Sequence, residues 1–145
     1  MNLKFKTLNS ITGKDQLHSD DKIVDFLHEH LEEYGDPKAD IQRCLDYVFD
    51  RGGFILLGLE DKEIKGAVII NETGMGGYIP ENILVYIAVH HDQRGKGVGK
   101  ELMKNALKLC KGDVALHVEA DNPAKFLYEK VGFTNPYLEM RYKRK

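Results

Sequence analysis

The sequence lacks tryptophan, has only four prolines, and contains no apolar run near the roughly 20 residues that a membrane-spanning helix needs. Residues 1–10 alternate between apolar and polar side chains, without the apolar stretch or small-residue cleavage site of a signal peptide. We therefore expect a cytoplasmic protein without membrane association. No linker, repeat or low-complexity tract divides the 145 residues, so a single domain over residues 1–145 is predicted.

Cysteine is scarce, and the two that occur do not form a metal site. Cys44 and Cys110 each fall within a helical pattern, and neither has a cysteine or histidine partner at metal-ligand spacing. A metal centre at the adjacent residues His90, His91 and Asp92 is also disfavoured, because consecutive side chains at the end of a strand point in opposite directions. We expect two core cysteines and no bound metal.

Charge is unevenly distributed along the chain. Residues 1–72 contain 15 acidic and 9 basic side chains, whereas residues 73–145 contain 8 acidic and 12 basic ones. The basic second half is suited to an anionic ligand and the acidic first half to a cationic one. Charged side chains that are simply exposed to solvent would account for the same uneven distribution. The densest basic cluster is the terminal segment 141–145, so no nucleic-acid partner is predicted.

The spacing of apolar residues predicts an alternation of helices and strands after a first strand within residues 1–10. Helices are expected at 20–34 and 39–49, a hairpin of strands at 54–59 and 66–70, a strongly apolar strand at 83–89, a helix at 98–109, a strand at 114–118, a helix at 123–131 and a last strand near 137–142. Ser19 or Asp20 is the expected N-cap of the first helix. This order indicates an α/β fold with a mixed central sheet and helices on both faces.

The most informative segment is residues 85–102, where a strand, a glycine-rich loop and an amphipathic helix follow one another. The loop holds three glycines and three basic side chains: Gly95, Gly97, Gly99, Arg94, Lys96 and Lys100. Without side-chain cover, several backbone N–H groups can converge on one anion beside the positive end of the helix dipole. The basic side chains favour a phosphate.

Two common phosphate-binding loops do not fit this spacing. A dinucleotide loop requires glycine three residues after Gly97, where Lys100 stands, and a Walker loop requires glycine at Arg94 and a hydroxyl side chain at Glu101. The loop therefore belongs to another class of anion site.

The segment R-G-K-G-V-G satisfies the R-x-x-G-x-G pattern of the GNAT N-acetyltransferase family, directly after a V-Y-I-A-V strand. Downstream, H-V-E-A-D-N-P-A-K-F-L-Y-E-K-V-G-F resembles the second motif of that family through Asn122, Tyr128, Gly132 and Phe133. The resemblance is close over residues 83–133, and elsewhere only the order of elements agrees.

This resemblance implies a GNAT-like acyl-CoA N-acyltransferase fold and acetyl-CoA as the co-substrate. In the family, acetyl-CoA lies between the fourth and fifth strands, with its pyrophosphate on the R-x-x-G-x-G backbone and its pantetheine arm along the fourth strand. The residues that this places at the co-substrate are Ile87, Ala88, Val89, Arg94, Gly95, Lys96, Gly97, Val98, Gly99, Lys100, Asn122 and Tyr128.

Acetyl transfer to an amine needs proton transfers at two points. An amine with a pKa near 10.4 must lose a proton before it attacks, and the departing thiolate gains one. By resemblance Tyr128 is the general acid, although a tyrosine at this position also suits a core. The carboxylate that family members often carry on the fourth strand is missing here, so Glu81 is the proposed general base, with Glu119 and His117 as alternatives.

The expected acceptor is a primary amine of a small molecule or peptide. The early helices carry acidic side chains that suit a cation or are simply exposed to solvent: Asp25, Glu29, Glu32, Glu33, Asp36 and Asp40. The alternative to an enzyme is a non-catalytic acetyl-CoA-binding module with a regulatory role, which the missing strand carboxylate favours and Tyr128 disfavours. A homodimer is compatible with the family resemblance.

Overall fold

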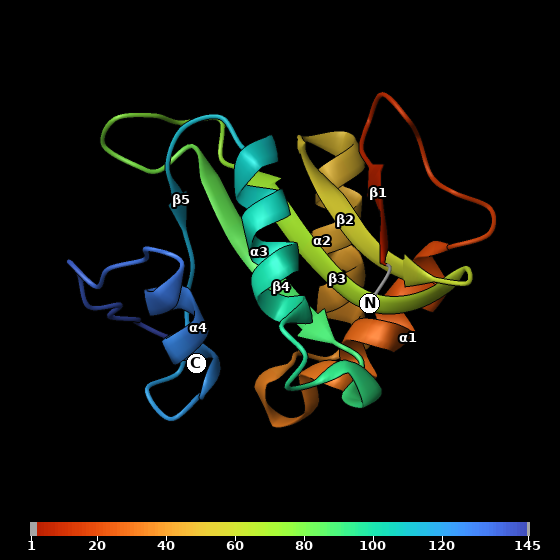
Figure 1. Ribbon diagram of the computed structural model, residues 1–145. Helices are drawn as coiled ribbons and strands as arrows, with labels where there is room; N and C mark the ends of the chain where they lie inside the picture. The colour runs from red at the N-terminus through yellow and green to blue at the C-terminus, as the bar shows by residue number, and fades with distance from the viewer. Residues whose placement is uncertain (1–2, 145) are drawn as a thin grey trace.

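The computed structural model describes residues 3–144 and contains a five-stranded mixed sheet (Figure 1). The strands lie in the order in which they occur along the chain: β1 (Lys4–Leu8), β2 (Gly53–Glu60), β3 (Glu63–Glu72), β4 (Asn82–Val89) and β5 (Val114–Ala115). Strands β1 to β4 are antiparallel to their neighbours, whereas β5 pairs parallel to β4. The parallel pair is therefore the last at one edge of the sheet.

Helices cover both faces of this sheet, as the sequence predicts (Figure 1). The helical elements are α1 (Asp20–Leu31), η1 (Glu32–Tyr34), α2 (Lys38–Asp50), η2 (His91–Gln93), α3 (Val98–Leu109) and α4 (Ala124–Lys130). Apolar residues of α1 and α2 form one core on the sheet, and those of α3 and α4 form the second core on the other face. Within residues 3–144, no helix is long and apolar enough to cross a membrane.

Local sequence signals account for the bounds of the first helix. The Ser19 side chain accepts a hydrogen bond from the Lys22 N–H (3.4 Å), which confirms Ser19 as the N-cap of α1. The helix ends at Leu31, and the predicted continuation to Tyr34 forms the short 3₁₀ turn η1 instead.

Strand β3 lies at the centre of the sheet, and β4 lies next to the short edge strand. Seven consecutive residues of β3, 64–70, are buried because helices cover both of its faces. Along β4, buried and half-buried residues alternate. The apolar run at 83–89 therefore forms a strand as predicted. A continuous apolar run also predicts a strand that is covered on both faces, and this expectation is wrong for β4, since the fully covered strand is β3.

A bulge in β4 changes the direction of this strand. Ile69 of β3 pairs with Tyr86 and Ile70 pairs with Leu84, so Val85 is an extra residue without a partner. The parallel pairing with β5 is confined to Asn82 and Ile83, both before the bulge. Beyond it, β4 and the chain after β5 are no longer paired.

Two expectations about the C-terminal third are wrong. The strand predicted at 114–118 is limited to Val114–Ala115, because β4 bends away after Ile83 and offers no further partner. The strand predicted near 137–142 is absent: residues 133–144 form neither helix nor strand, and most of their side chains are exposed. A two-residue β5 provides too short an edge for another strand to pair with.

Candidate functional site

The glycine-rich loop connects β4, through η2, to the first turn of α3. Gly95 and Gly97 have positive φ angles of 77° and 80°, which side chains with a Cβ rarely adopt. Gly97 is the N-cap residue of α3. The two glycines therefore permit the reversal that brings the chain from the sheet into the helix.

Five backbone N–H groups in this loop and the first turn of α3 have no hydrogen-bond acceptor among residues 3–144. They belong to Gly95, Gly97, Val98, Gly99 and Lys100. The first N–H groups of a helix lack intrahelical partners, and the helix dipole adds partial positive charge at the same place. We call this group of N–H donors the amide cradle. It can bind an anion such as a phosphate.

The three basic side chains of the loop differ in what they contact. The Arg94 guanidinium donates to Glu32 Oε1 and, at 2.8 Å, to the carbonyl of His30. The hydrogen bond and charge of Arg94 hold the pKa of Glu32 below its usual value. Lys96 and Lys100 are exposed and form no ion pair within the described part of the chain. Arg94 thus anchors the loop to the turn after α1, whereas the two lysines are available to an anion.

Helix α4 packs close to the amide cradle. A Cβ added to Gly99 would lie 3.2 Å from Leu127 Cδ2 and 3.7 Å from Val89 Cγ2. This close approach leaves little room for a side chain at position 99, because Leu127 would have to move by a few tenths of an ångström. It brings the end of β4, the first turn of α3 and α4 together at the place where β4 and β5 separate.

The predicted pantetheine-binding residues Ile87, Ala88 and Val89 lie after the bulge, where β4 has no strand partner on its β5 side. No hydrogen bond joins their backbone to residues 116–123 in the described structure. This edge of β4 therefore has room for a ligand that pairs with a strand.

Tyr128 lies on α4 and faces the second core. Its side chain is buried, with the ring centroid 6.0 Å from that of Phe133. Burial, and secondarily the charge of Glu119, raises the pKa of Tyr128 to about 12. The phenol therefore remains protonated at neutral pH and can donate a proton. Asn122 lies just before α4, and its Oδ1 accepts a hydrogen bond from the Ala124 N–H at 2.9 Å.

Glu81 lies at the start of β4, the end opposite to the glycine loop. Its Oε1 accepts a hydrogen bond from the Asp113 N–H (3.1 Å), and its side chain packs against Gly112. The strand between Glu81 and the loop is eight residues long, about 26 Å when extended. The alternatives Glu119 and His117 are exposed on the chain that follows β5.

Two tyrosine contacts near the turn between α1 and α2 were not predicted. Tyr34 Oη donates to the carbonyl of Asp121 (3.2 Å) and so joins this turn to the β5–α4 loop. Tyr86 Oη donates to Asp36 Oδ2 (2.5 Å), and burial raises the pKa of Tyr86. The two residues of each contact are 87 and 50 positions apart in the sequence. The local spacing of residues therefore does not predict either contact.

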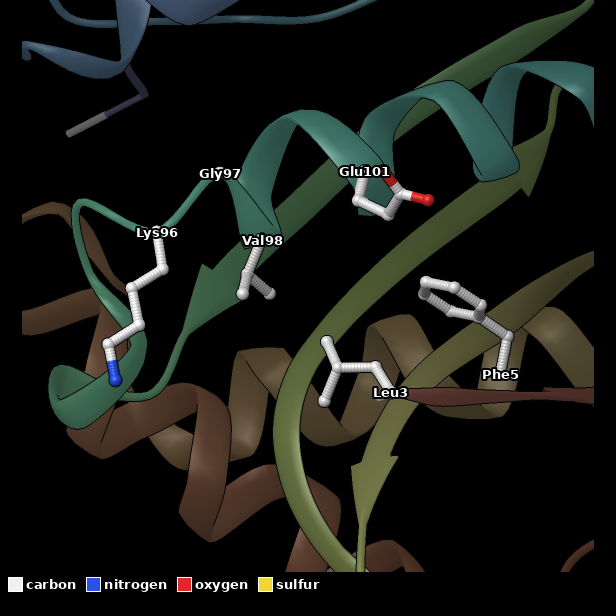
Figure 2. A pocket seen from close by; sticks show the side chains of 6 residues that line it. All are labelled: Leu3, Phe5, Lys96, Gly97, Val98 and Glu101. Carbon is white, nitrogen blue, oxygen red and sulfur yellow. The ribbon is translucent and has the colours of Figure 1, made fainter. Parts of the chain in front are cut away.

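A shallow pocket of about 250 Å³ borders the glycine loop on the side of α3 that faces β1 (Figure 2). It is lined by Leu3, Phe5, Lys96, Gly97, Val98 and Glu101. Because β1 and β5 are at opposite edges of the sheet, this pocket is distinct from the region between β4 and β5.

Comparison with known proteins gives consistent matches. The profile of the "Acetyltransferase (GNAT) family" matches residues 16–133. The "Cysteine-rich protein 2-binding protein" of Mus musculus is 31% identical over 116 residues, and that of Homo sapiens 32%; each match covers 76% of this chain but only 13% of the relative. The chain thus corresponds to a small part of these curated relatives.

Solved structures share the fold at low sequence identity. A ribosomal-protein-alanine N-acetyltransferase from Brucella melitensis biovar Abortus 2308 has a TM-score of 0.68 at 18% identity, covering 99% of this chain and 100% of that one. The aminoglycoside N-acetyltransferase AAC(6')-Iy in complex with CoA has a TM-score of 0.71 at 15% identity, covering 99% and 95%.

Proposed function

Because this chain belongs to the Acetyltransferase (GNAT) family, we propose that it transfers the acetyl group of acetyl-CoA to a primary amine. The observation that carries this proposal is the amide cradle, whose five N–H groups have no acceptor among residues 3–144. Lys96 and Lys100 add positive charge beside it. A diphosphate is the anion that best matches several N–H donors and two lysines.

The unpaired edge of β4 at Ile87, Ala88 and Val89 is the proposed site of the pantetheine arm. This edge begins beside the cradle, since the loop follows β4 directly. An amide-containing chain can pair with such an edge as another strand would. The thioester would then reach the region between β4 and α4, where Tyr128 is located.

The proposed chemistry is direct attack of the amine in a ternary complex. A base accepts the proton of the ammonium group, the amine nitrogen bonds to the thioester carbonyl carbon, and the carbon–sulfur bond breaks. Tyr128, which its raised pKa keeps protonated at neutral pH, donates its proton to the departing sulfur, and the second proton that leaves the nitrogen restores the phenol. For the base we propose Glu81 or Glu119.

A cationic acceptor is proposed from the charge around Tyr34. Glu33, Glu119 and Asp121 all contribute to raising the pKa of this tyrosine, after desolvation by burial. Acidic side chains from the α1–α2 turn and the β5–α4 loop thus lie near each other. Two proteins with a similar fold are named for acetylating a protein alanine and aminoglycosides, both of which present amines.

Calorimetry with CoA, followed by a thiol-release assay with acetyl-CoA and a panel of amines, tests the proposal. We expect heat on mixing with CoA and thiol release with a cationic amine. Binding of CoA without thiol release from any amine would support the non-catalytic module instead. Absence of CoA binding would contradict both functions.

A further inference from the structure

Three histidines gather where α1 meets the end of β4, outside the amide cradle. The His30 ring centroid lies 4.4 Å from that of His90 and 4.5 Å from that of His91. His30 is 5% exposed, although it is a polar residue on a helix. Packing of this kind concentrates imidazole nitrogens, which are common transition-metal ligands.

Three side chains of this region can point donor atoms at one position. One donor atom each from Glu29, His30 and His91 lies within 4.8 Å of the other two. His30 Nε2 and Glu29 Oε2 are already 3.2 Å apart. Two ligands of a tetrahedral zinc ion, each at about 2.0–2.1 Å from the metal, are roughly 3.3 Å apart. The third donor, from the half-exposed His91, lies within 4.8 Å of the other two, so its side chain must move closer to reach the same spacing.

The hydrogen bonding of His30 is incomplete without a further partner. Its Nδ1 is buried and has no hydrogen-bond partner among the described residues. A buried polar atom that is left unpaired costs about 1–3 kcal/mol. The nitrogen that lies beside Glu29 is the other one, Nε2, at 3.2 Å, so an ion shared by these two side chains would be bound through Nε2 and would replace the proton in that contact. Because Nδ1 has no partner among the described residues, no hydrogen bond of the protein fixes which ring nitrogen carries the remaining proton.

The surroundings of the three side chains also suit a cation. Glu32 Oε1 lies 3.2 Å from His91 Nε2 and can orient this imidazole as a carboxylate does in many metal centres. The same carboxylate forms an ion pair with the Arg94 guanidinium. Glu29 and His91 are 68% and 50% exposed, so an ion can enter from solvent.

We propose that Glu29, His30 and His91 form a binding site for Zn²⁺, with water as the remaining ligand. Two imidazoles and one carboxylate are a donor set that zinc accepts, whereas Mg²⁺ and Ca²⁺ prefer oxygen ligands. The ion would link α1 to η2, the segment just before the glycine loop. The sequence alone disfavours metal binding by the adjacent residues His90, His91 and Asp92. The proposed site instead combines His91 of η2 with two residues of α1.

Calorimetric titration of the full chain with ZnCl₂, after removal of bound metal with EDTA, tests this proposal. We expect one Zn²⁺ per chain, and affinity lower by about tenfold or more in E29Q and H91Q, since even outer-shell partners often contribute this much. Both side chains are exposed, so these variants should fold. H28Q, an exposed histidine on the same helix, and C110S, which removes a half-buried thiol, should bind zinc like the parent.

Imidazole NMR signals locate the ion independently of affinity. Zinc should shift the ring signals of His30 and His91 and leave those of His28 unchanged, and MgCl₂ should shift none of them. The proposal is overturned if zinc produces no heat, if H91Q and H28Q bind it equally, or if only other histidines respond. These readouts do not involve CoA, so the zinc site and the acetyltransferase proposal can fail separately.

Discussion

The guanidinium of Arg94 is bound to Glu32 and to the His30 carbonyl, and it therefore holds the glycine loop against the end of α1. The resemblance to the family places Arg94 at the pyrophosphate, and the structure adds a side-chain contact that can persist while the backbone N–H groups of the loop bind an anion. Both side chains of the pair are about half exposed, so its energetic contribution is small.

We expect R94Q and E32Q to weaken CoA binding by similar factors, about two- to fivefold, because each releases the same loop. The double variant should be no weaker than either single one, since the two side chains act as a unit. Calorimetric dissociation constants for the four proteins provide the measurement. A much larger loss in R94Q than in E32Q would mean that the guanidinium contacts the diphosphate itself.

The amide cradle can be tested with two glycines that have the same conformation. Gly97 and Gly74 have φ angles of 80° and 75°, and an added Cβ would meet nothing within 4 Å at either position. G97A and G74A should each destabilise the fold by about 1–2 kcal/mol, the usual cost of a left-handed conformation for alanine. Denaturant unfolding measures this shared cost.

Only the first of these two changes affects the proposed anion site. G97A should weaken CoA binding by about tenfold or more, since disturbing a charge-assisted hydrogen bond typically costs about 1.5–3 kcal/mol. G74A lies in the β3–β4 connection and should bind CoA like the parent. Equal affinities in the two variants would contradict the location of the diphosphate at the loop.

Local patterns were sufficient to predict most of the elements around the site. Helix α3 has the predicted bounds, Val98–Leu109, because its apolar spacing, its glycine N-cap and its position after a buried strand all indicate the same structure. The glycine loop was predicted for the same reason. Its function depends on backbone N–H groups within a few residues of one another, which sequence spacing describes well.

The separation of β4 and β5 depends on a feature that sequence does not encode locally. The extra residue Val85 lies within an apolar run that reads as an uninterrupted strand, and only the pairing of Ile69 and Ile70 reveals the bulge. The shortened β5 and the absent last strand both follow from this bend. The same limit applies to the contacts of Arg94 and Tyr34, which join segments distant in sequence.

Tyr128 should act in turnover and not in binding of the co-substrate. We expect Y128F to lower kcat by about tenfold and to leave the dissociation constant of CoA unchanged. This is below the usual 10²–10⁴ of acid–base catalysis, because a thiol with a pKa near 8.5 is already a good leaving group. The phenylalanine ring preserves the packing on Phe133, so folding should be retained.

The raised pKa of Tyr128 adds a second expectation for this variant. A phenol with a pKa of about 12 stays protonated throughout the usual assay range, so the parent should show no loss of kcat at moderately basic pH that Y128F lacks. Y137F, which alters an exposed tyrosine, is the matched control and should retain full turnover. Unchanged turnover in Y128F would remove the tyrosine from the mechanism.

The two proposed bases lie in different structural settings, and this makes them separable. Glu81 accepts the Asp113 N–H at the far end of β4, whereas Glu119 is near enough to Tyr128 and Tyr34 to raise both of their pKa values. If Glu119 is the base, E119Q should lower kcat/KM by about 10²-fold or more and alter its rise with pH. E81Q should then affect mainly stability, by about 1 kcal/mol, because a neutral amide oxygen replaces the charged oxygen that accepts the Asp113 N–H. If Glu81 is the base, the two outcomes exchange. The pH profile of kcat/KM and the midpoint of denaturant unfolding, measured on both variants, separate these cases. An unaltered profile in both would exclude the two carboxylates and leave either His117 as the base or an acceptor that enters the site already neutral.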